Sequence, residues 1–594
     1  MTAASVAVRA ADLLGARRHA DVAAACGLAA FTGALVAATW GTWGDLDSDT
    51  GYDVVAGARV ADGELPYRDF TYYYGPLAPF VSGLAALAGG EGLGPAVALG
   101  LAIALAIVAA TFALARAVLG PLGAFFAAAI TAAVAFIPSN YSFVLPHTFA
   151  ATLGTLFLLL VLLGLWRYTV TGSSRWAVAA GAALGLATLT KPEPAAAATL
   201  AVVVWLLYRA RTGAGARLPA SLVAGPALAV PVLAYGSIMT VVSPGVLLLE
   251  NLWPVDELEA GGSTLVRARM PLSVESVDDL LRHSLPYAAG VLALLGLARL
   301  LERPGRHRRP LLAACALAGL VFVAACVARP DGLRDGLYYA YGWIPLGALV
   351  AVIVVGRRIR RGRTGAPAGI ELAGAVALLV LAVTTYNGFV FHGWRPNMAH
   401  YYVPLAAVLV ARIHLVELAR SRTAYVLNVA WVALLLAAGT GLALKDARSE
   451  TVVVSGPGGA LAETPAEGAA YQAALDEIAT RTEPGEPILA APLMTGLHVL
   501  SGHESPLPEL SLLPGALPGR ADQLAAAEEL DRAGVRLVLT NRREWLGYGH
   551  GAFGETFDQV LAGWIERNFD RVATLPARGT PLVAIDVWVR RDSS

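Results

Sequence analysis

The sequence TFAATLGTLFLLLVLLGLW, at residues 148–166, contains no charged side chain. A helix of that length is about 30 Å long, which matches the hydrocarbon core of a bilayer. The whole chain shares this character: its 594 residues have a mean hydropathy of +0.60, and only 15% of them are charged. Such a composition excludes an ordinary soluble protein and predicts a polytopic membrane protein.

Similar apolar blocks recur through the first 445 residues, and we expect about thirteen membrane spans, give or take two. The blocks lie roughly at 20–40, 97–118, 122–138, 148–166, 175–190, 194–210, 218–241, 286–302, 310–328, 342–356, 368–386, 402–418 and 424–444. Arginine is concentrated in alternate loops, including 303–309 and 357–363. The positive-inside rule therefore predicts that residues 1–19 are cytoplasmic and that the loop at 41–96 is extracytoplasmic.

After residue 445 the apolar blocks give way to alternating helix and strand patterns. The stretch YQAALDEIATRTEPGEPILAAP, at 471–492, has a helical pattern, a Pro/Gly turn and a short apolar strand. We therefore expect a mainly α-helical membrane domain at 20–445, followed by a small extracytoplasmic α/β domain at 446–594. The cysteines, Cys26, Cys315 and Cys326, all fall in predicted spans, so the α/β domain is expected to have no disulfide.

Seven carboxylates are concentrated in DLDSDTGYDVVAGARVADGELPYRDF, at residues 45–70. Carboxylates held near a membrane boundary can supply a general base, because low dielectric and like charges raise a carboxyl pKa. No cofactor is predicted with certainty, but the D-x-D-x-D spacing of Asp45, Asp47 and Asp49 can hold a divalent cation through oxygen ligands. A solvated loop with an N-capping aspartate accounts for the same residues, with Tyr72, Tyr73 and Tyr74 as interface anchors.

Several segments, in this order, resemble the polytopic glycosyltransferases of the C superfamily. They are DSDTGYD at 47–53, GELPYRDF at 63–70, YGPL at 74–77, GLATLTKPE at 185–193 and WRPNMAHYYVPL at 394–405. The nearest group is the one that includes protein mannosyltransferases and lipid A aminoarabinose transferases. The resemblance covers about residues 20–445 and implies a sugar donor linked to polyprenyl phosphate.

The resemblance also implies roles for individual residues. The acidic pair in the first outside loop of that superfamily falls here on Asp49 and Thr50, which implies that Asp49 is the catalytic base. Because Thr50 replaces the second acid, Asp47 or Asp53 remains an alternative. For the donor phosphate we expect a site at Lys191, Arg395, His400 and Tyr401, although a lysine that only snorkels to the membrane interface explains Lys191 equally well. For the acceptor or the sugar we expect contacts with Tyr72, Tyr73, Tyr74 and Arg334, which an interface belt explains equally well.

The expected function is that of an inverting glycosyltransferase in the cytoplasmic membrane of a bacterium, with a lipid, glycan or protein as acceptor. A transporter or flippase of lipid-linked sugars is the first alternative, and a polymerase or ligase of surface glycans is the second. The sequence has no Walker or dinucleotide glycine motif in a strand-to-helix setting, which argues against an ATP-driven or nicotinamide reaction. We expect a membrane environment and no nucleic-acid partner.

Overall fold

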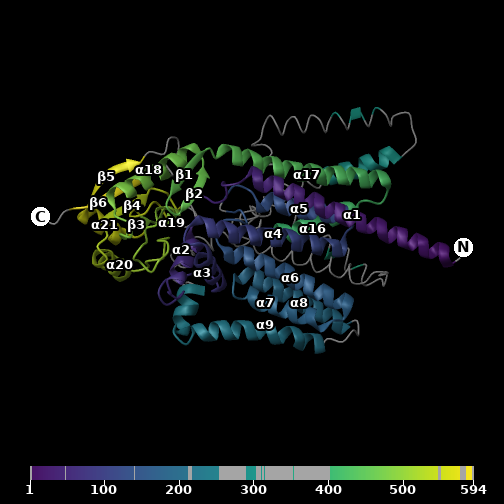
Figure 1. Ribbon diagram of the computed structural model, residues 1–594, viewed down its shortest axis with the longest axis horizontal. Coiled ribbons are helices and arrows are strands. Elements are labelled where there is room, and N and C mark those ends of the chain that lie inside the picture. Colours follow the sequence, from purple (N-terminus) through teal and green to yellow (C-terminus); the bar gives the residue numbers. More distant parts are fainter. Residues whose placement is uncertain are drawn as a thin grey trace.

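The computed structural model describes most of the chain as an elongated molecule with helices at one end and an α/β domain at the other (Figure 1). The described residues are 3–46, 49–139, 141–211, 217–252, 289–302, 402–545, 550–575 and 584–591, with single positions between 310 and 357.

Long apolar helices make up the first part of the chain. They are α1 (Ala3–Ala38), α4 (Leu93–Val118), α5 (Pro121–Ala135), α6 (Phe149–Thr171), α7 (Ser174–Ala187), α8 (Pro192–Arg211), α9 (Arg217–Ile238), α16 (Val403–Arg412) and α17 (Arg422–Ser449). Two π-helical turns, η1 (Val246–Leu252) and η3 (Ile413–Glu417), accompany them. Among the described residues, six of these helices are long and apolar enough to cross a membrane: α1, α4, α6, α8, α9 and α17.

Most of the predicted spans coincide with helices of the structure. The predicted span at 175–190 differs from the structure at its carboxyl end, because α7 stops at Ala187. The carbonyls of Leu189 and Thr190 instead accept hydrogen bonds from the amides of Leu77 and Gly75, at 3.0 and 2.7 Å. The predicted spans at 310–328, 342–356 and 368–386 lie largely or wholly outside the described residues, so the number of spans stays a prediction.

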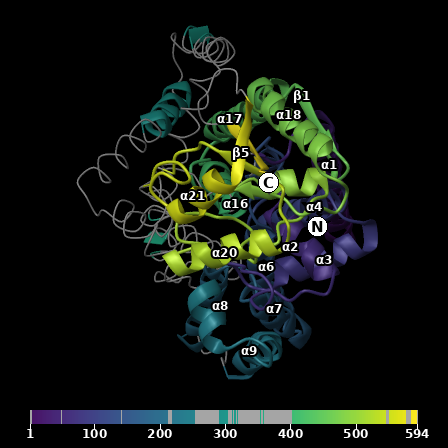
Figure 2. The same cartoon turned by 90° about the vertical axis from the view of Figure 1, so that its left-hand side faces the viewer.

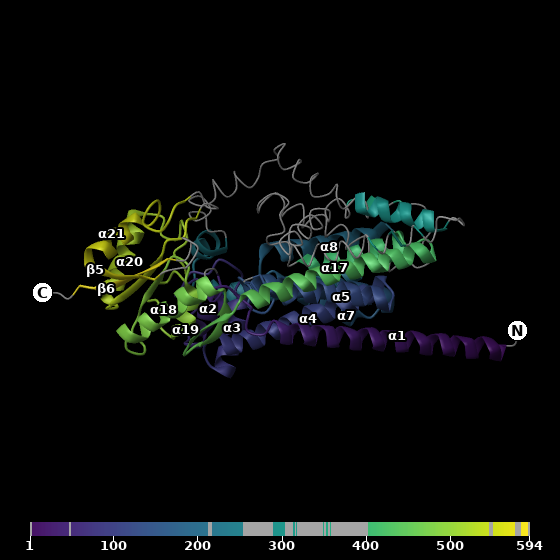
Figure 3. The same ribbon diagram turned by 90° about the horizontal axis from the view of Figure 1, so that it is seen from above.

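Small residues let these helices approach closely. Seen end-on, α7, α8 and α9 lie together on one side of the helical part (Figure 2). A methyl group at Gly181 of α7 would lie 2.2 Å from the carbonyl oxygen of Val223 in α9. Close contact of this kind favours helix association in lipid, where burial from water contributes little. From above, α1 extends beyond its neighbours at the end remote from the α/β domain (Figure 3).

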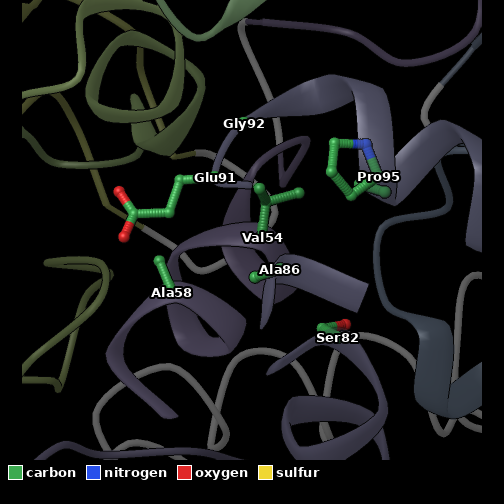
Figure 4. A pocket seen from close by; sticks show the side chains of 8 residues that line it. Val54, Ala58, Ser82, Ala86, Glu91, Gly92 and Pro95 are labelled. Carbon is green, nitrogen blue, oxygen red and sulfur yellow. The ribbon is translucent and has the colours of Figure 1, made fainter. Parts of the chain in front are cut away.

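Two short helices, α2 (Tyr52–Ala61) and α3 (Leu77–Gly89), lie between α1 and α4. They pack closely, since a methyl group at Gly57 would lie 2.6 Å from the Cβ atom of Ser82. A small cavity remains between α2, α3 and the start of α4 (Figure 4). Its lining consists of Val54, Ala58, Ser82, Ala86, Glu91, Gly92, Pro95 and Ala96.

The α/β domain, residues 452–591, begins with a hairpin of β1 (Val452–Gly456) and β2 (Gly459–Glu463). Its main sheet has the strand order β3-β4-β6-β5, in which β3 and β4 are parallel and the other pairs are antiparallel. The strands are β3 (Leu489–Ala491), β4 (Leu537–Asn541), β5 (Phe569–Leu575) and β6 (Ile585–Arg590). The helices are α18 (Pro465–Arg481), α19 (Thr495–Ser501), α20 (Arg520–Arg532) and α21 (Gln559–Asn568).

Hydrogen bonds join the α/β domain to the segment between α1 and α4. Each of them uses a backbone group on at least one side, so they depend on the path of the chain more than on side-chain identity. The pairs are Ala462 N to Gly41 O at 2.8 Å, Leu46 N to Glu463 Oε1 at 2.8 Å, Leu93 N to Gly458 O at 2.8 Å, Thr495 Oγ1 to Thr50 O at 3.1 Å, Arg59 Nη1 to Leu507 O at 3.0 Å and Thr71 N to Pro508 O at 3.0 Å. The first loop and the α/β domain therefore form one continuous structure.

Candidate active site

The acidic loop is held in a tight turn at its centre. The Thr50 hydroxyl accepts a hydrogen bond from the amide of Asp45 at 2.7 Å, and Thr50 is fully buried. Gly51 has a φ of +106°, in the left-handed region that favours glycine. A methyl group there would lie 2.9 Å from the carbonyl oxygen of Thr495. These contacts fix the position of Asp49, between Asp45 and Gly51.

Asp49 is a carboxylate with unusual surroundings. Its side chain is half-buried, with protein around it on most sides, and this burial raises its pKa to about 6. The positive charges of Arg543 and Lys191 lower the pKa, whereas the negative charges of Asp45 and Asp53 raise it. A carboxylate with this pKa is ionised at neutral pH and is a stronger base than an ordinary aspartate, which suits a general base.

Asp53 lies nearby, but both of its carboxylate oxygens already accept hydrogen bonds from protein groups. The residue is only 4% exposed, and its Oδ1 accepts a hydrogen bond from the Tyr72 hydroxyl at 2.5 Å. Its Oδ2 accepts from the Thr148 hydroxyl at 2.9 Å and from the amide of Phe149, the first residue of α6. Burial raises the pKa of Asp53, although these hydrogen bonds oppose the rise. The contacts favour a role for Asp53 in holding α2, Tyr72 and α6 together, and they favour Asp49 as the base.

Lys191 lies beside an aromatic ring and a histidine. Its Nζ is 4.7 Å from the ring centroid of Tyr74 and 3.4 Å from Nε2 of His147. Because an ammonium only donates, the second contact favours neutral His147 with its proton on Nδ1. Lys191 reaches this place because the Gly75 amide bonds to Thr190 at 2.7 Å. The structure thus brings together Lys191 and Tyr74, both of which the sequence singled out.

The sequence did not single out His147. It belongs to the buried segment between α5 and α6, where its ring lies 6.5 Å from Tyr74 and 6.4 Å from Tyr141, measured between centroids. One signal was available: His147 is the last residue before the apolar block at 148–166, on the side of the membrane predicted for the acidic loop.

The three predicted sugar-contacting tyrosines differ in their environment. Tyr72 is fully buried, stacks on Tyr52 at 5.5 Å and donates its hydroxyl to Asp53. It is therefore part of the packed interior and unsuited to stack on a sugar. Tyr73 and Tyr74 are half-buried and keep exposed surface beside the site.

Arg543, which the sequence also did not single out, comes from the α/β domain. It follows β4, and its guanidinium carbon lies 4.7 Å from the ring centroid of Trp545. Its charge is the strongest opposing influence on the raised pKa of Asp49. Sequence reasoning had no means of finding it, because residue 543 is almost 500 positions from the acidic loop.

Several predicted site residues lie outside the described residues: Asp47, Arg334, Arg395, His400 and Tyr401. Their roles stay predictions. In the part of the chain that the structure describes, no group of three His, Cys, Asp or Glu side chains is arranged to hold a metal ion. The cation site expected at Asp45, Asp47 and Asp49 includes an undescribed residue and also stays a prediction.

Comparisons with known proteins find similar structures only. No protein-family model and no curated protein sequence matches the chain. An Archaeoglobus fulgidus oligosaccharyltransferase, crystallised with Zn and sulfate, has a TM-score of 0.46 and 14% identity, over 88% of this chain and 67% of that one. The same organism's AglB, in complex with an inhibitory peptide and a dolichol-phosphate, has a TM-score of 0.47 and 14% identity, over 96% and 76% of the two chains.

ArnT from Cupriavidus metallidurans, bound to undecaprenyl phosphate, is also similar. Its TM-score is 0.43 with 17% identity, over 95% of this chain and 98% of that one. At these TM-scores and identities, the function of the chain has to be inferred from its own residues.

Proposed function

We propose that this chain is a multi-pass membrane glycosyltransferase that moves a sugar from a polyprenyl-phosphate donor to an acceptor hydroxyl. The observation that carries the proposal is Asp49, whose pKa is about 6 and whose loop lies between the helices and the α/β domain. Two cations, Lys191 and Arg543, act on this carboxylate. A base and cations at one membrane boundary suit a substrate with a lipid tail, an anionic phosphate and a sugar.

The proposed reaction uses Asp49 as the general base. Asp49 accepts the proton of the acceptor hydroxyl, and the hydroxyl oxygen forms a bond to the anomeric carbon of the sugar. The bond from that carbon to the phosphate oxygen breaks, and its electron pair leaves with the polyprenyl phosphate. Attack from the face opposite the phosphate inverts the configuration at the anomeric carbon. Lys191 stabilises the negative charge that the leaving phosphate gains.

The position of these groups favours transfer over transport. Asp49, Asp53 and Lys191 lie at the end of the helices that adjoins the α/β domain, where His147 and Tyr74 also lie. A transporter binds its cargo near the middle of the membrane, commonly at broken helices. Charged groups at one end of the helices instead suit a reaction at one face of the membrane.

The test is transfer from a panel of synthetic polyprenyl-phosphate sugars by the purified full chain in nanodiscs. We expect Asp49→Asn to lower turnover by about 10² to 10⁴, because the amide cannot accept the proton. Its thermal midpoint should stay close to that of the wild type. Asp62→Asn, at an exposed position of the same acidic stretch, is the matched control and should retain its rate. Near wild-type turnover by Asp49→Asn would exclude Asp49 as the base.

A further inference from the structure

The topology of the α/β domain directs two of its loops toward the acidic loop. Strands β3 and β4 are parallel, with Ala491 opposite Thr540, so their carboxyl ends lie at the same edge of the sheet. The segment after β3 leads directly to Thr495, whose hydroxyl bonds to the Thr50 carbonyl at 3.1 Å. The segment after β4 leaves the same edge and carries Arg543. Ligand sites in α/β domains commonly form at the carboxyl ends of parallel strands.

The acidic loop packs closely against the α/β domain at the carboxyl edge of β3 and β4, which fixes the distance between the loop and the domain. A methyl group at Gly51 would lie 2.9 Å from the amide nitrogen of Gly496, and one at Gly496 would lie 2.5 Å from Leu46. Gly51 therefore permits a backbone contact that other residues would prevent, whereas a methyl group at Gly496 would meet the end of the Leu46 side chain. Side chains at this edge of the sheet are held beside the acidic loop.

The side chain of Arg543 is held in place by a buried aromatic residue. Its guanidinium lies over the ring of Trp545, which packs in a cluster with Leu493 and Phe557. The neighbouring Arg542 differs, because its guanidinium forms two hydrogen bonds with Asp586, at 2.8 and 2.9 Å. The two arginines are adjacent in sequence, and of the two it is Arg543 whose charge acts on Asp49.

The carboxyl groups around Asp49 make a second cation necessary if an anionic donor is to bind beside them. Among the described side chains, those whose charges act on Asp49 are the cations Arg543 and Lys191 and the carboxylates Asp45 and Asp53. An anionic donor adds further negative charge to a site that already holds three carboxyl groups. Lys191 alone would leave that phosphate facing an excess of acid, and like charges at close range are repulsive.

We propose that Arg543 supplies, from the α/β domain, a positive charge that binds the phosphate of the donor together with Lys191. The inference rests on the proposed function and extends it, because it makes the α/β domain part of the donor site. Arginine suits this role, since its planar guanidinium can bind two phosphate oxygens at once.

The experiment measures binding of polyprenyl phosphate without a sugar, using the purified full chain in nanodiscs and native mass spectrometry. We expect Arg543→Ala to weaken binding by about 10- to 100-fold, the loss of one charge-assisted phosphate contact. Arg543→Gln, which keeps the length of the side chain, should show a similar loss. Arg543→Lys should recover part of the affinity, because it restores the charge but not the planar guanidinium that binds two phosphate oxygens.

Arg542→Ala is the matched control and should bind polyprenyl phosphate as tightly as the wild type does. Equal binding by wild type, Arg543→Ala and Arg543→Gln would overturn the role of Arg543 and leave the proposed function intact. A wild-type chain that binds no polyprenyl phosphate would instead overturn the proposed function itself. Equal losses in Arg542→Ala and Arg543→Ala would show a general effect on the domain and would also contradict the proposal.

Discussion

Asp49 and Asp53 lie close in sequence but have different surroundings. Asp53 is surrounded by donors, from Tyr72, Thr148 and the first amide of α6. Asp49 has long-range charges around it and keeps partial exposure, through which a hydroxyl can reach it. The two carboxylates therefore suit different tasks: one stabilises the fold of the loop, and the other can exchange a proton.

The pKa of Asp49 predicts the pH dependence of transfer. A base must be ionised, so kcat/KM should be constant above about pH 7 and should fall tenfold per pH unit below about pH 6. Burial is the main cause of this value, and the charges of Arg543, Asp45, Lys191 and Asp53 adjust it. The proposed donor is a phosphodiester, which stays ionised in this range and does not contribute. A rate that stays constant down to pH 5 would contradict the assignment.

At the level of elements, a backbone contact brings Lys191 to the site. The chain at Gly75 lies against Leu189 and Thr190, and a methyl group at Gly75 would lie 2.3 Å from the Leu189 carbonyl carbon. Tyr74 precedes this contact and Lys191 follows it. The two side chains therefore meet because α3 begins where α7 ends.

Gly75→Ala should separate these segments. We expect it to lower the free energy of unfolding by about 1 to 3 kcal/mol, the usual range for overpacking, and to reduce transfer through the displacement of Lys191. Gly94→Ala is the control, because that helical glycine has open space around it and alanine favours helix. Thermal unfolding in detergent, followed by tryptophan fluorescence, measures the difference. Equal midpoints for the two variants would contradict the packing argument.

A second element-level prediction concerns the β1-β2 hairpin, where burial raises the pKa of Glu463 to about 9. The charge of Asp45 is the next cause of this rise. Folded Glu463 is thus protonated at neutral pH, whereas unfolded Glu463 is ionised above about pH 4.5. The folded state binds more protons, so stability falls as the pH rises from about 5 to 9.

Glu463→Gln should remove this part of the pH dependence. Glutamine keeps the carbonyl oxygen that accepts from the Leu46 amide at 2.8 Å. We expect the thermal midpoint at pH 8 to rise by about 2 °C or more, with little change at pH 5. Glu528→Gln, on an exposed position of α20, serves as the control. A lower midpoint for Glu463→Gln at pH 8 would contradict the protonated state.

Sequence patterns predict the helices well because each apolar block is local and must match the bilayer. The acidic stretch and Lys191 stood out as charges next to such blocks, and the family resemblance singled out Asp49 within that stretch. The contacts of Arg543 and His147 could not be predicted, because they depend on where distant backbones meet. The interior position of Tyr72 could not be predicted either, because an interface anchor and a buried tyrosine have the same sequence pattern.

At the scale of the whole molecule, the orientation in the membrane is a prediction that the structure does not test. The distribution of arginine predicts that residues 357–363 are cytoplasmic and that the α/β domain is outside. In a chain without its native cysteines, Glu483→Cys, at an exposed position, should react in intact cells with an impermeant maleimide. Arg360→Cys should react only after the membrane is opened. The reverse pattern would invert the topology and would place the candidate site on the cytoplasmic face.

The hydrogen bond between Thr50 and Thr495 joins positions 445 residues apart. A ribosome adds about 5 to 20 residues per second, so roughly 20 to 90 seconds separate the synthesis of the two partners. During that interval the acidic loop lacks its contacts with the α/β domain, and Asp49 lacks the charge of Arg543. A nascent or prematurely terminated chain can therefore occupy the membrane without carrying out the proposed transfer. The proposed activity therefore requires that the segment carrying Thr495 has been made and folded.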